Sequence, residues 1–329
     1  MKKYNISIVG STGLVGKTFV NIINESDLPI GKIIFYASLK SKGKIINYKN
    51  DEYKVDVLNN NSFKNMDFVF FFAGSKVSSQ YGEVAEKRGA IVIDNSSYFR
   101  NNKDIPLIVP EINIEDFFTS KRRIIANPNC STIQSIVPIY AISKKYKIKS
   151  INYSTYQSIS GAGYNAILDY YNSLNNKEST YFNIDIKNTC IPFIGDILDN
   201  NYTSEEMKMI NETKKILHLN NEIVNATCIR VPVLYCHGVL IELELDSNFE
   251  VEDINKLLRS FNNIKILDDI KNNIYPNSIT SFNNDYIYVG RIRKHIAKKN
   301  TVLLYCVSDN LRKGDASNAL EIFKKIIKS

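Results

Sequence analysis

The chain has 329 residues, of which 44% are hydrophobic, and a formal net charge of +8. This length favours about two domains. No run approaches the ~18 to 20 consecutive apolar residues of a membrane span, and the N-terminus MKKYNISIVGST lacks the features of a signal peptide, so we expect a cytoplasmic protein. Lys and Arg are spread along the chain without a nucleic-acid-binding signature. The charge therefore predicts no nucleic-acid partner, although a mild positive field would help to collect anionic ligands.

The cysteines give little indication of a metal site or of disulfides. No C-x-x-C pair occurs, so we expect no zinc site and no other bound metal. An odd number of cysteines in a cytoplasmic chain argues against a disulfide framework. The five are Cys130, Cys190, Cys228, Cys236 and Cys306.

The first half of the chain alternates strands with helices. Helices are expected after the glycine-rich loop and up to Arg88. Strands are expected at 4–9, 33–37, 67–73 and 91–94. Such alternation is typical of a parallel, doubly wound sheet, whose ligands bind at the carboxyl ends of the strands.

The second half has a different pattern. Segments 149–157 and 224–246 alternate polar and apolar residues, and a helix is expected from about Thr203 to His218. This pattern favours a mixed or antiparallel sheet with helices on one face. The last segment, GDASNALEIFKKIIK, predicts a helix that returns to the first domain. The stretch 172–190 looks the most flexible.

We therefore expect an α/β protein with two domains. A Rossmann-like doubly wound parallel sheet would occupy residues 1–128, completed by a C-terminal helix at 309–329. An α+β domain with a mixed sheet would occupy residues 129–308.

A glycine-rich loop, GSTGLVG, follows the first predicted strand. Its glycines allow a tight turn, close approach of a pyrophosphate, and close packing of the next helix. The first N–H groups of that helix would bind the phosphates. The spacing is G-x-x-G-x-x-G rather than G-x-G-x-x-G, so a plain structural turn is the alternative. The expected dinucleotide contacts are Gly10, Thr12, Gly13, Leu14 and Val15.

The end of the second strand indicates which dinucleotide binds. NAD sites usually carry Asp or Glu there, whereas this chain has ASLKSKGK. The hydroxyls of Ser38 and Ser41 and the cation of Lys40 suit a 2′-phosphate, which favours NADP(H) over NAD. Lys42 and Lys44 could equally belong to a solvated basic loop.

Cys130 stands at a predicted junction of strand and helix. In IIANPNCST an apolar strand ends, Pro128 imposes an extended bend, and Cys130 opens an apolar helix. A thiol at a helix N-terminus has its pKa lowered by the aligned peptide dipoles, which favours a nucleophilic thiolate. Most cysteines are instead small buried apolar residues, but the flanking Asn-Pro-Asn and Ser-Thr favour a nucleophile.

These segments resemble those of the aspartate-semialdehyde dehydrogenase family. IANPNCSTIQ is similar to that family's active-site segment, and GSTGLVG to its G-A-T-G-x-V-G loop. Further similar segments follow in the family's order: VIDNSSYFR, VPEIN, STYQSISGAG, EEMK, RVPVLYCH, VGRIRK and SDNLRKG. The resemblance implies that NADPH reduces L-aspartyl 4-phosphate to L-aspartate 4-semialdehyde and phosphate. This step serves the biosynthesis of lysine, diaminopimelate, threonine, methionine and isoleucine.

The resemblance also implies roles for the matching residues. Cys130 would form a thioester, which accepts hydride more readily than a carboxylate, His237 would be the acid/base residue, and Gln157 would orient the acyl group. The substrate- and phosphate-binding positions match Arg100, Asn129, Glu205, Lys208 and Arg230. Further cofactor positions match Ser160, Gly161 and Asn310. Lys40 departs from the family's usual Arg, which keeps the charge but loses the two-point fork.

The spacing of these residues raises two structural points. Arg230 and His237 are seven apart, so a regular strand would point them to opposite faces. Pro232 disfavours regular pairing, and we expect a bend or strand end between them. Glu205 and Lys208 share a helix face, where a surface ion pair of little value is the alternative. Glu206 would instead form a capping box with Thr203.

Three other classes compete with this interpretation. An N-acetyl-γ-glutamyl-phosphate reductase would have a cysteine segment like N-P-G-C-Y, whereas this chain has Asn129 and Ser131 around Cys130. A catalytically silent NADP-sensing protein would have little use for the four residues Cys130, Gln157, Arg230 and His237. A cysteine hydrolase would not explain the glycine loop. The resemblance further implies that the second domain builds a homodimer.

Overall fold

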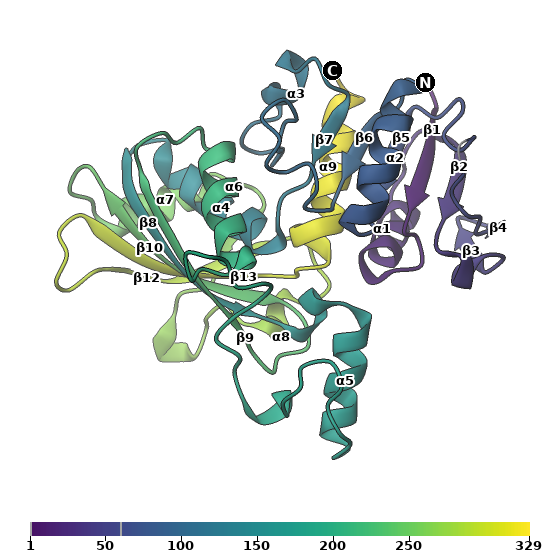
Figure 1. Cartoon of the computed structure of the whole chain (residues 1–329). Coiled ribbons are helices and arrows are strands. Elements are labelled where there is room, and N and C mark those ends of the chain that lie inside the picture. The colour runs from purple at the N-terminus through teal and green to yellow at the C-terminus, as the bar shows by residue number, and fades with distance from the viewer. Residues whose placement is uncertain (1, 60) are drawn as a thin grey trace. The chain divides into compact units, whose positions relative to one another are not determined.

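The computed structural model describes residues 2–59 and 61–329, which form two compact units (Figure 1). The first unit comprises the chain up to Asn129 together with Asp315–Ser329, and the second comprises Cys130–Gly314.

The first unit is built on a parallel sheet. Its strands are buried on both faces, which explains their nearly continuous apolar sequences, such as FVFF and IVID. The strands are β1 (Tyr4–Val9), β2 (Ile30–Tyr36), β5 (Phe68–Phe71), β6 (Ile91–Asp94) and β7 (Ile124–Ala126), in the order β2-β1-β5-β6-β7. The strand predicted at 33–37 begins three residues earlier in the structure, and the strand observed within the predicted range 67–73 is shorter at both ends.

Helices cover both faces of this sheet, as expected of a doubly wound fold (Figure 1). Helices α1 (Leu14–Glu25) and α9 (Ser317–Ile326) pack on one face, and α2 (Ser75–Lys87) on the other. The chain leaves β1 toward β2 and then returns to β5 on the other side, so the order reverses between β1 and β5. Ligands of such sheets bind at this reversal. The remaining elements are η1 (Leu39–Ser41), β3 (Ile45–Tyr48), β4 (Asp51–Lys54) and α3 (Glu115–Thr119).

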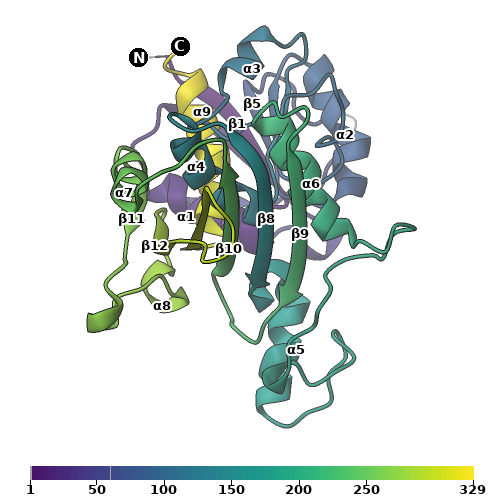
Figure 2. The ribbon, with the colours of Figure 1, turned by 90° about the vertical axis from the view of Figure 1, so that its left-hand side faces the viewer.

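The second unit contains a six-stranded mixed sheet, which confirms the expected architecture. Its strands β8, β9 and β10 lie side by side in Figure 2. The strands are β8 (Ile148–Gln157), β9 (Ile223–Arg230), β10 (His237–Leu245), β11 (Ile264–Ile266), β12 (Ile287–Lys294) and β13 (Thr301–Ser308), in the order β11-β12-β13-β10-β8-β9. The segment 224–246 therefore forms two strands, and the expected strand end between Arg230 and His237 is confirmed.

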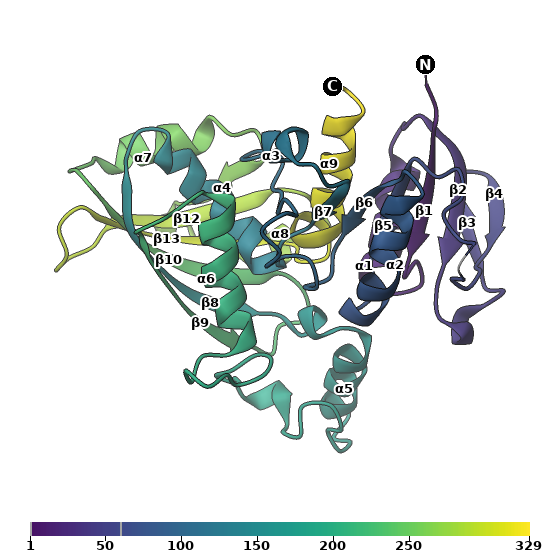
Figure 3. The same ribbon diagram turned by 45° about the horizontal axis from the view of Figure 1, so that its top comes forward.

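Three helices lie over one face of this sheet (Figure 3). They are α4 (Cys130–Ser143), α6 (Ser204–Ile216) and α7 (Val251–Arg259). The helix expected from Thr203 to His218 is α6, and Thr203 and Glu206 form the predicted capping box at its start. The other elements are η2 (Ile159–Ala162), α5 (Tyr164–Leu174), η3 (Ile186–Asn188), η4 (Ile270–Asn272), α8 (Ser278–Ser281) and the π-helical turn η5 (Arg312–Ala316).

No helix in the described ranges combines the length and the apolar character needed to cross a membrane.

Candidate active site

The glycine-rich loop follows β1 at the reversal of strand order. Gly10 has a φ of +82°, and a Cβ there would lie 2.5 Å from the carbonyl oxygen of Phe72. A Cβ on Gly16 would lie 2.2 Å from the carbonyl oxygen of Gly10. Gly13 is the N-cap of α1 and has no side chain to cap it. Two of the glycines are therefore required by close packing, and the third leaves the helix N-terminus accessible to an anion.

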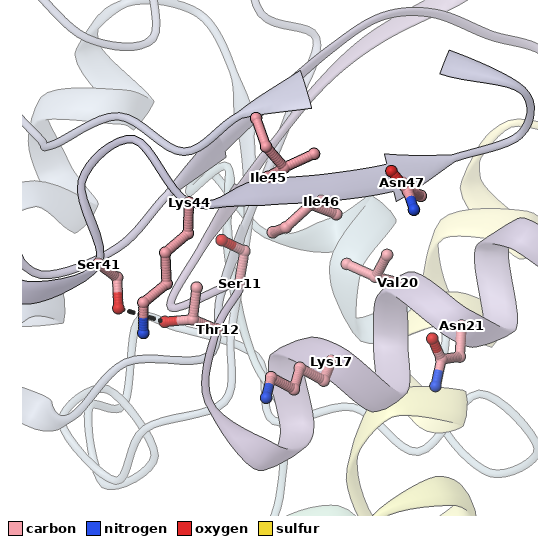
Figure 4. A pocket seen from close by; sticks show the side chains of 10 residues that line it. All are labelled: Ser11, Thr12, Lys17, Val20, Asn21, Ser41, Lys44, Ile45, Ile46 and Asn47. Carbon is pink, nitrogen blue, oxygen red and sulfur yellow. Dashed lines mark hydrogen bonds between the residues drawn. The ribbon is translucent and has the colours of Figure 1, made fainter. Parts of the chain in front are cut away.

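A pocket of about 450 Å³ opens beside this loop (Figure 4). Thr12 donates a hydrogen bond to the Ser41 hydroxyl across 3.2 Å, which joins the glycine loop to the turn after β2. Lys17 on α1 and Lys44 before β3 both line the pocket. The lining that the structure describes contains these two cations and no carboxylate. It therefore suits a phosphate that carries two negative charges.

The cations of this pocket differ from the one that the sequence indicated. Lys40 lies in the exposed turn η1 and Ser38 is its N-cap, and the pocket lining includes neither of them. Lys44 is exposed and also lines the pocket. Lys17 is an exposed residue of α1, and nothing in the sequence distinguishes it from other lysines that face solvent.

Cys130 is the first residue of α4, as the sequence predicted. The helix is almost entirely buried and contains Pro138, which has no N–H to donate to the carbonyl of Gln134. The Cys306 thiol donates to this carbonyl instead, with its sulfur 3.7 Å from the Gln134 oxygen. Gly314 packs on Cys130, since a Cβ there would lie 2.8 Å from the Cys130 Cβ. The cysteine is thus held between a rigid helix and a glycine.

A chain of hydrogen bonds joins Gln157, Glu205 and Lys208. The Gln157 amide donates to Glu205 Oε1 across 3.2 Å, and Lys208 Nζ donates to Glu205 Oε2 across 3.0 Å. Gln157 and Glu205 are buried, whereas the Lys208 side chain is one-third exposed. This pair is therefore more than a surface ion pair, because its carboxylate also fixes a buried amide.

Arg230 ends β9 directly beside Gln157, its partner in the pairing of β8 and β9. Its guanidinium is buried and donates to the Ser158 carbonyl across 2.6 Å. Burial lowers the pKa of Arg230, and the carboxylate of Glu205 and the sulfur of Cys130 partly offset that effect. Arg230, Glu205 and Cys130 therefore lie close enough to interact electrostatically.

His237 begins β10 and is fully buried. Its Nδ1 accepts the main-chain N–H of Ser158 across 3.0 Å, and its carbonyl accepts the Gln134 amide across 2.9 Å. Its Nε2 has no hydrogen-bond partner in the described part of the chain. Burial, with the positive charge of Arg230 second, lowers the pKa of His237 to about 3. The imidazole is therefore neutral near pH 7.

Asn310 holds the surroundings of His237 together. Its Oδ1 accepts hydrogen bonds from the Ser158 hydroxyl (3.2 Å), the Ser160 hydroxyl (3.1 Å) and the Cys236 N–H (3.0 Å). Cys236 has a φ of +70°, a conformation that costs a residue with a side chain about 1–3 kcal/mol. Gly161 faces the same place, since a Cβ there would lie 2.9 Å from His237 Nε2 and 3.1 Å from the Arg230 guanidinium.

The structure thus brings most of the candidate catalytic residues into one cluster. This cluster, called the catalytic cluster below, lies within the second unit and comprises Cys130, Gln157, Glu205, Lys208, Arg230 and His237. Arg100 and Asn129 belong to the first unit, where both are buried and Arg100 donates to the Asn95 carbonyl across 2.8 Å.

The remaining cysteines have different surroundings. Burial raises the pKa of Cys228 and of Cys306 to about 12, and burial likewise raises the pKa of Cys236. Cys190 is exposed in the segment between η3 and α6. The three buried thiols are therefore poor nucleophiles near neutral pH.

Comparisons with known proteins agree with this arrangement. Residues 5–120 match the family model of the semialdehyde dehydrogenase NAD-binding domain, and residues 139–313 match that of the semialdehyde dehydrogenase dimerisation domain. An aspartate-semialdehyde dehydrogenase of Aquifex aeolicus is 40% identical, over 99% of this chain and 98% of its own length. One of Campylobacter jejuni is 41% identical, over 98% and 97%.

A solved structure is similar along the whole chain. Aspartate semialdehyde dehydrogenase II of Vibrio cholerae, complexed with ASA, superposes with a TM-score of 0.95 at 35% identity and covers 100% of this chain and 99% of its own. With matches of this extent over both units, the chain belongs to the aspartate-semialdehyde dehydrogenase family.

Proposed function

We propose that this protein reduces L-aspartyl 4-phosphate to L-aspartate 4-semialdehyde and phosphate through a thioester on Cys130. The observation that carries the proposal is the catalytic cluster, in which a cysteine at a helix N-terminus lies near a buried Arg, a buried Glu and a neutral His. The relatives named aspartate-semialdehyde dehydrogenase support it.

Each side chain of the cluster has a task in this reaction. The sulfur of Cys130 attacks the acyl carbon and expels phosphate, which leaves a thioester. Arg230 holds the substrate α-carboxylate and Glu205 its ammonium group, so these two charges bind the two groups on the substrate's α-carbon. Lys208 neutralises phosphate. The resemblance also assigns phosphate binding to Arg100 and Asn129, which belong to the first unit. Gln157 and His237 serve the carbonyl group that reacts.

We further propose that the first unit binds NADPH, which supplies the hydride when bound. The glycines 10, 13 and 16 and the open N-terminus of α1 fit a pyrophosphate. The two lysines of the pocket beside them fit a 2′-phosphate. For the second unit, the resemblance assigns cofactor contacts to Ser160, Gly161 and Asn310.

The preference for NADP over NAD tests whether this pocket binds the 2′-phosphate. Lys44→Ala should raise the KM for NADP about tenfold or more and leave the KM for NAD nearly unchanged, because only NADP carries the extra phosphate. The matched control Lys40→Ala changes a cation outside the pocket and should have a smaller effect. Equal effects of Lys44→Ala on both dinucleotides would contradict a 2′-phosphate site here.

We propose that the working form is a homodimer. The helices α4, α6 and α7 cover one face of the six-stranded sheet, and the other face carries partly exposed side chains. They include Tyr156, Leu240, Leu303 and Tyr305. A second copy would bury this face, which lies within the segment that matches a dimerisation domain. A cytoplasmic setting is proposed because the nucleophilic thiol must stay reduced.

The experiment that tests the reaction runs it backwards. Purified protein is given L-aspartate semialdehyde, NADP and phosphate, and NADPH is followed by absorbance. Activity that requires phosphate and is lost in Cys130→Ser would support both the reaction and the thioester. Turnover of N-acetylglutamate semialdehyde instead would move the assignment to the related reductase, and no turnover of either would refute the proposal.

A further inference from the structure

Residues 179–191, called the strap below, run from beside helix α5 to the edge of the six-stranded sheet. Helix α5 lies beyond the ends of β8 and β9 (Figure 2), and β9 is an edge strand. At the end of the strap, Ile191 exchanges two main-chain hydrogen bonds of 2.9 Å with Arg230. The strap therefore ends on the residue to which the proposed function gives the substrate α-carboxylate.

Asp169 on α5 holds the start of the strap. Its side chain is buried, and its Oδ1 accepts the main-chain N–H groups of Thr180 (2.6 Å) and Tyr181 (3.1 Å). Its Oδ2 accepts the Ser179 hydroxyl (2.6 Å) and the Phe182 N–H (3.3 Å). Hydrogen bonds to a carboxylate are strong, so Asp169 fixes the point at which Tyr181 leaves the main chain.

Lys187 adds a second attachment between the strap and α5. Its ammonium group donates to the Ser173 carbonyl across 2.7 Å and to Asn176 Oδ1 across 2.8 Å. The Ser173 hydroxyl in turn donates to Asp185 of the strap. The strap is thus attached near its start, in its middle and at its end, and Tyr181 projects from a fixed support.

The Tyr181 side chain reaches the turn that packs on Arg230. Tyr181 is 45% exposed, and its hydroxyl donates to the carbonyl of Ala162, the last residue of η2, across 3.1 Å. A Cβ on the preceding residue, Gly161, would lie 3.1 Å from the Arg230 guanidinium. Burial lowers the pKa of Arg230, and the Tyr181 phenol is among the groups that partly offset this effect, after Glu205 and the sulfur of Cys130. Tyr181 therefore lies near Arg230 and holds the turn beside it.

We propose that Tyr181 is a positioning residue for Arg230: its hydroxyl holds η2 against the guanidinium, and Asp169 holds Tyr181 in place. The inference rests on the proposed function, in which Arg230 binds the substrate α-carboxylate. It assigns a part in substrate binding to a residue of the strap.

The kinetic parameter that Tyr181 controls follows from the chemistry of the α-carboxylate. A guanidinium binds a carboxylate through two parallel hydrogen bonds, which requires a fixed orientation of its plane. The α-carboxylate takes no part in the bonds that form and break, so its contact with Arg230 is equally strong before and during the reaction. An interaction of this kind changes KM and leaves kcat unchanged. A looser Arg230 should therefore weaken the binding of substrate without slowing the chemical step.

The first test removes only the Tyr181 hydroxyl. In phosphate-dependent reduction of NADP, Tyr181→Phe should raise the KM for L-aspartate semialdehyde about 3- to 10-fold, the effect of one lost hydrogen bond. The kcat and the KM values for phosphate and NADP should stay within about twofold. The control Tyr171→Phe alters another exposed tyrosine, on α5, and should change none of these values.

The outcomes separate this inference from the proposed function. A wild-type protein that does not turn over L-aspartate semialdehyde would refute both. An active wild type with an unchanged KM in Tyr181→Phe would refute this inference alone. A fall in kcat with KM retained would also refute it, because Tyr181 would then serve the chemical step or the general stability of the fold.

A second test asks whether Tyr181 acts through Arg230. Arg230→Lys keeps the charge but removes the two-point fork. In this background Tyr181→Phe should raise the KM for L-aspartate semialdehyde less than about twofold, since η2 no longer has a guanidinium to hold. A rise as large as in the wild-type background would show that the effect does not pass through Arg230 and would overturn the proposal.

A third test places Asp169 in the same chain of contacts. Asp169→Asn should raise the same KM, and the double variant with Tyr181→Phe should have a KM within about twofold of the higher single variant, because residues that act in series are not additive. Circular dichroism confirms that each variant is folded. A KM in the double variant equal to the product of both single effects would show that Asp169 does not act through Tyr181.

Discussion

Gly161→Ala is the substitution that most sharply tests the geometry of the catalytic cluster. The added Cβ would lie 2.8 Å from His237 Cε1, 2.9 Å from His237 Nε2 and 3.1 Å from Arg230 NH1. Ordinary carbon contacts are about 3.5–4.0 Å, so the imidazole must retreat by roughly 0.6–1 Å. That movement lengthens or breaks the 3.0 Å hydrogen bond from Ser158.

A displacement of this size has a known kinetic cost. A misplacement of ~1 Å in an active site can lower the rate by about 10²-fold, so we expect kcat of Gly161→Ala to fall about 10²-fold. The assay is phosphate-dependent reduction of NADP with L-aspartate semialdehyde at saturating substrates. Because Gly161 also falls at a proposed cofactor contact, the KM for NADP is measured alongside. A change in KM with kcat retained would assign Gly161 to the cofactor alone.

Gly163→Ala is the matched control in the same turn. Gly163 has a φ of +92° and nothing within 4 Å of its would-be Cβ. Its substitution should cost about 1–2 kcal/mol of stability through backbone strain and leave kcat within about threefold. If Gly161→Ala kept kcat within the same threefold, the claim that the cluster depends on this close contact would be refuted.

Three further predictions concern residues outside the catalytic chemistry. Titration of the native protein with a disulfide reagent near pH 7.5 should leave Cys228, Cys236 and Cys306 unmodified, since burial raises the pKa of each thiol. Rapid modification of more than two thiols would contradict the structure. The variant Cys190→Ser should keep full activity. Thr203→Ala breaks the capping box of α6 and should lower the free energy of unfolding by about 0.5–2 kcal/mol in urea titrations, with KM unchanged. A stability equal to the wild type would show that the cap contributes nothing. Burial alone would raise the pKa of Asp169. Hydrogen bonds from the Ser179 hydroxyl and from the main chain of residues 180–182 nevertheless hold this pKa below its ordinary value. The stability that the Asp169 carboxylate contributes is therefore present above about pH 4 and lost as the pH falls below that. The protection factors of amides 180–182, taken relative to the intrinsic exchange rate at each pH, should therefore fall in acid and, at neutral pH, in Asp169→Asn. Unchanged protection in that variant would contradict this account.

The sequence predicted those parts of the fold in which the local pattern of apolar residues matches the burial that the structure gives them. The strands of the first sheet are apolar along their whole length because the sheet is covered on both faces, so β1, β5 and β6 stand out without any knowledge of their partners. The capping box Thr203–Glu206 likewise depends only on residues three apart. These features are local, and a local pattern suffices to find them.

The parts that were missed depend on contacts between distant residues. The hairpin of β3 and β4 and the helix α5 have mixed polar sequences with no clear period. Asp169 on α5 binds the loop at 179–182, in a stretch whose composition suggested flexibility. The sequence suggested Lys40 for a 2′-phosphate because charge near the end of a strand can be read from a sequence, and this assignment stays a prediction. The direction in which each lysine points cannot be read in that way, and in the structure Lys17 and Lys44 line the pocket beside the glycine loop.

Arg230 and His237 are seven residues apart, so a single regular strand would point their side chains to opposite faces, whereas the fold brings them together. The two residues lie on different strands that flank β8: Arg230 pairs with Gln157, and Gly238, next to His237, pairs with Tyr156. Both side chains are thereby delivered to the end of β8, where Ser158 receives the guanidinium on its carbonyl and gives its N–H to the imidazole. One residue orients both groups through its main chain, so no side-chain pattern at position 158 could have revealed its importance. The side-chain hydroxyl adds contacts with Asn310, Ser160 and His237 Nδ1. Because both main-chain hydrogen bonds remain in Ser158→Ala, this variant should disturb the cluster less than a change at either residue that Ser158 orients.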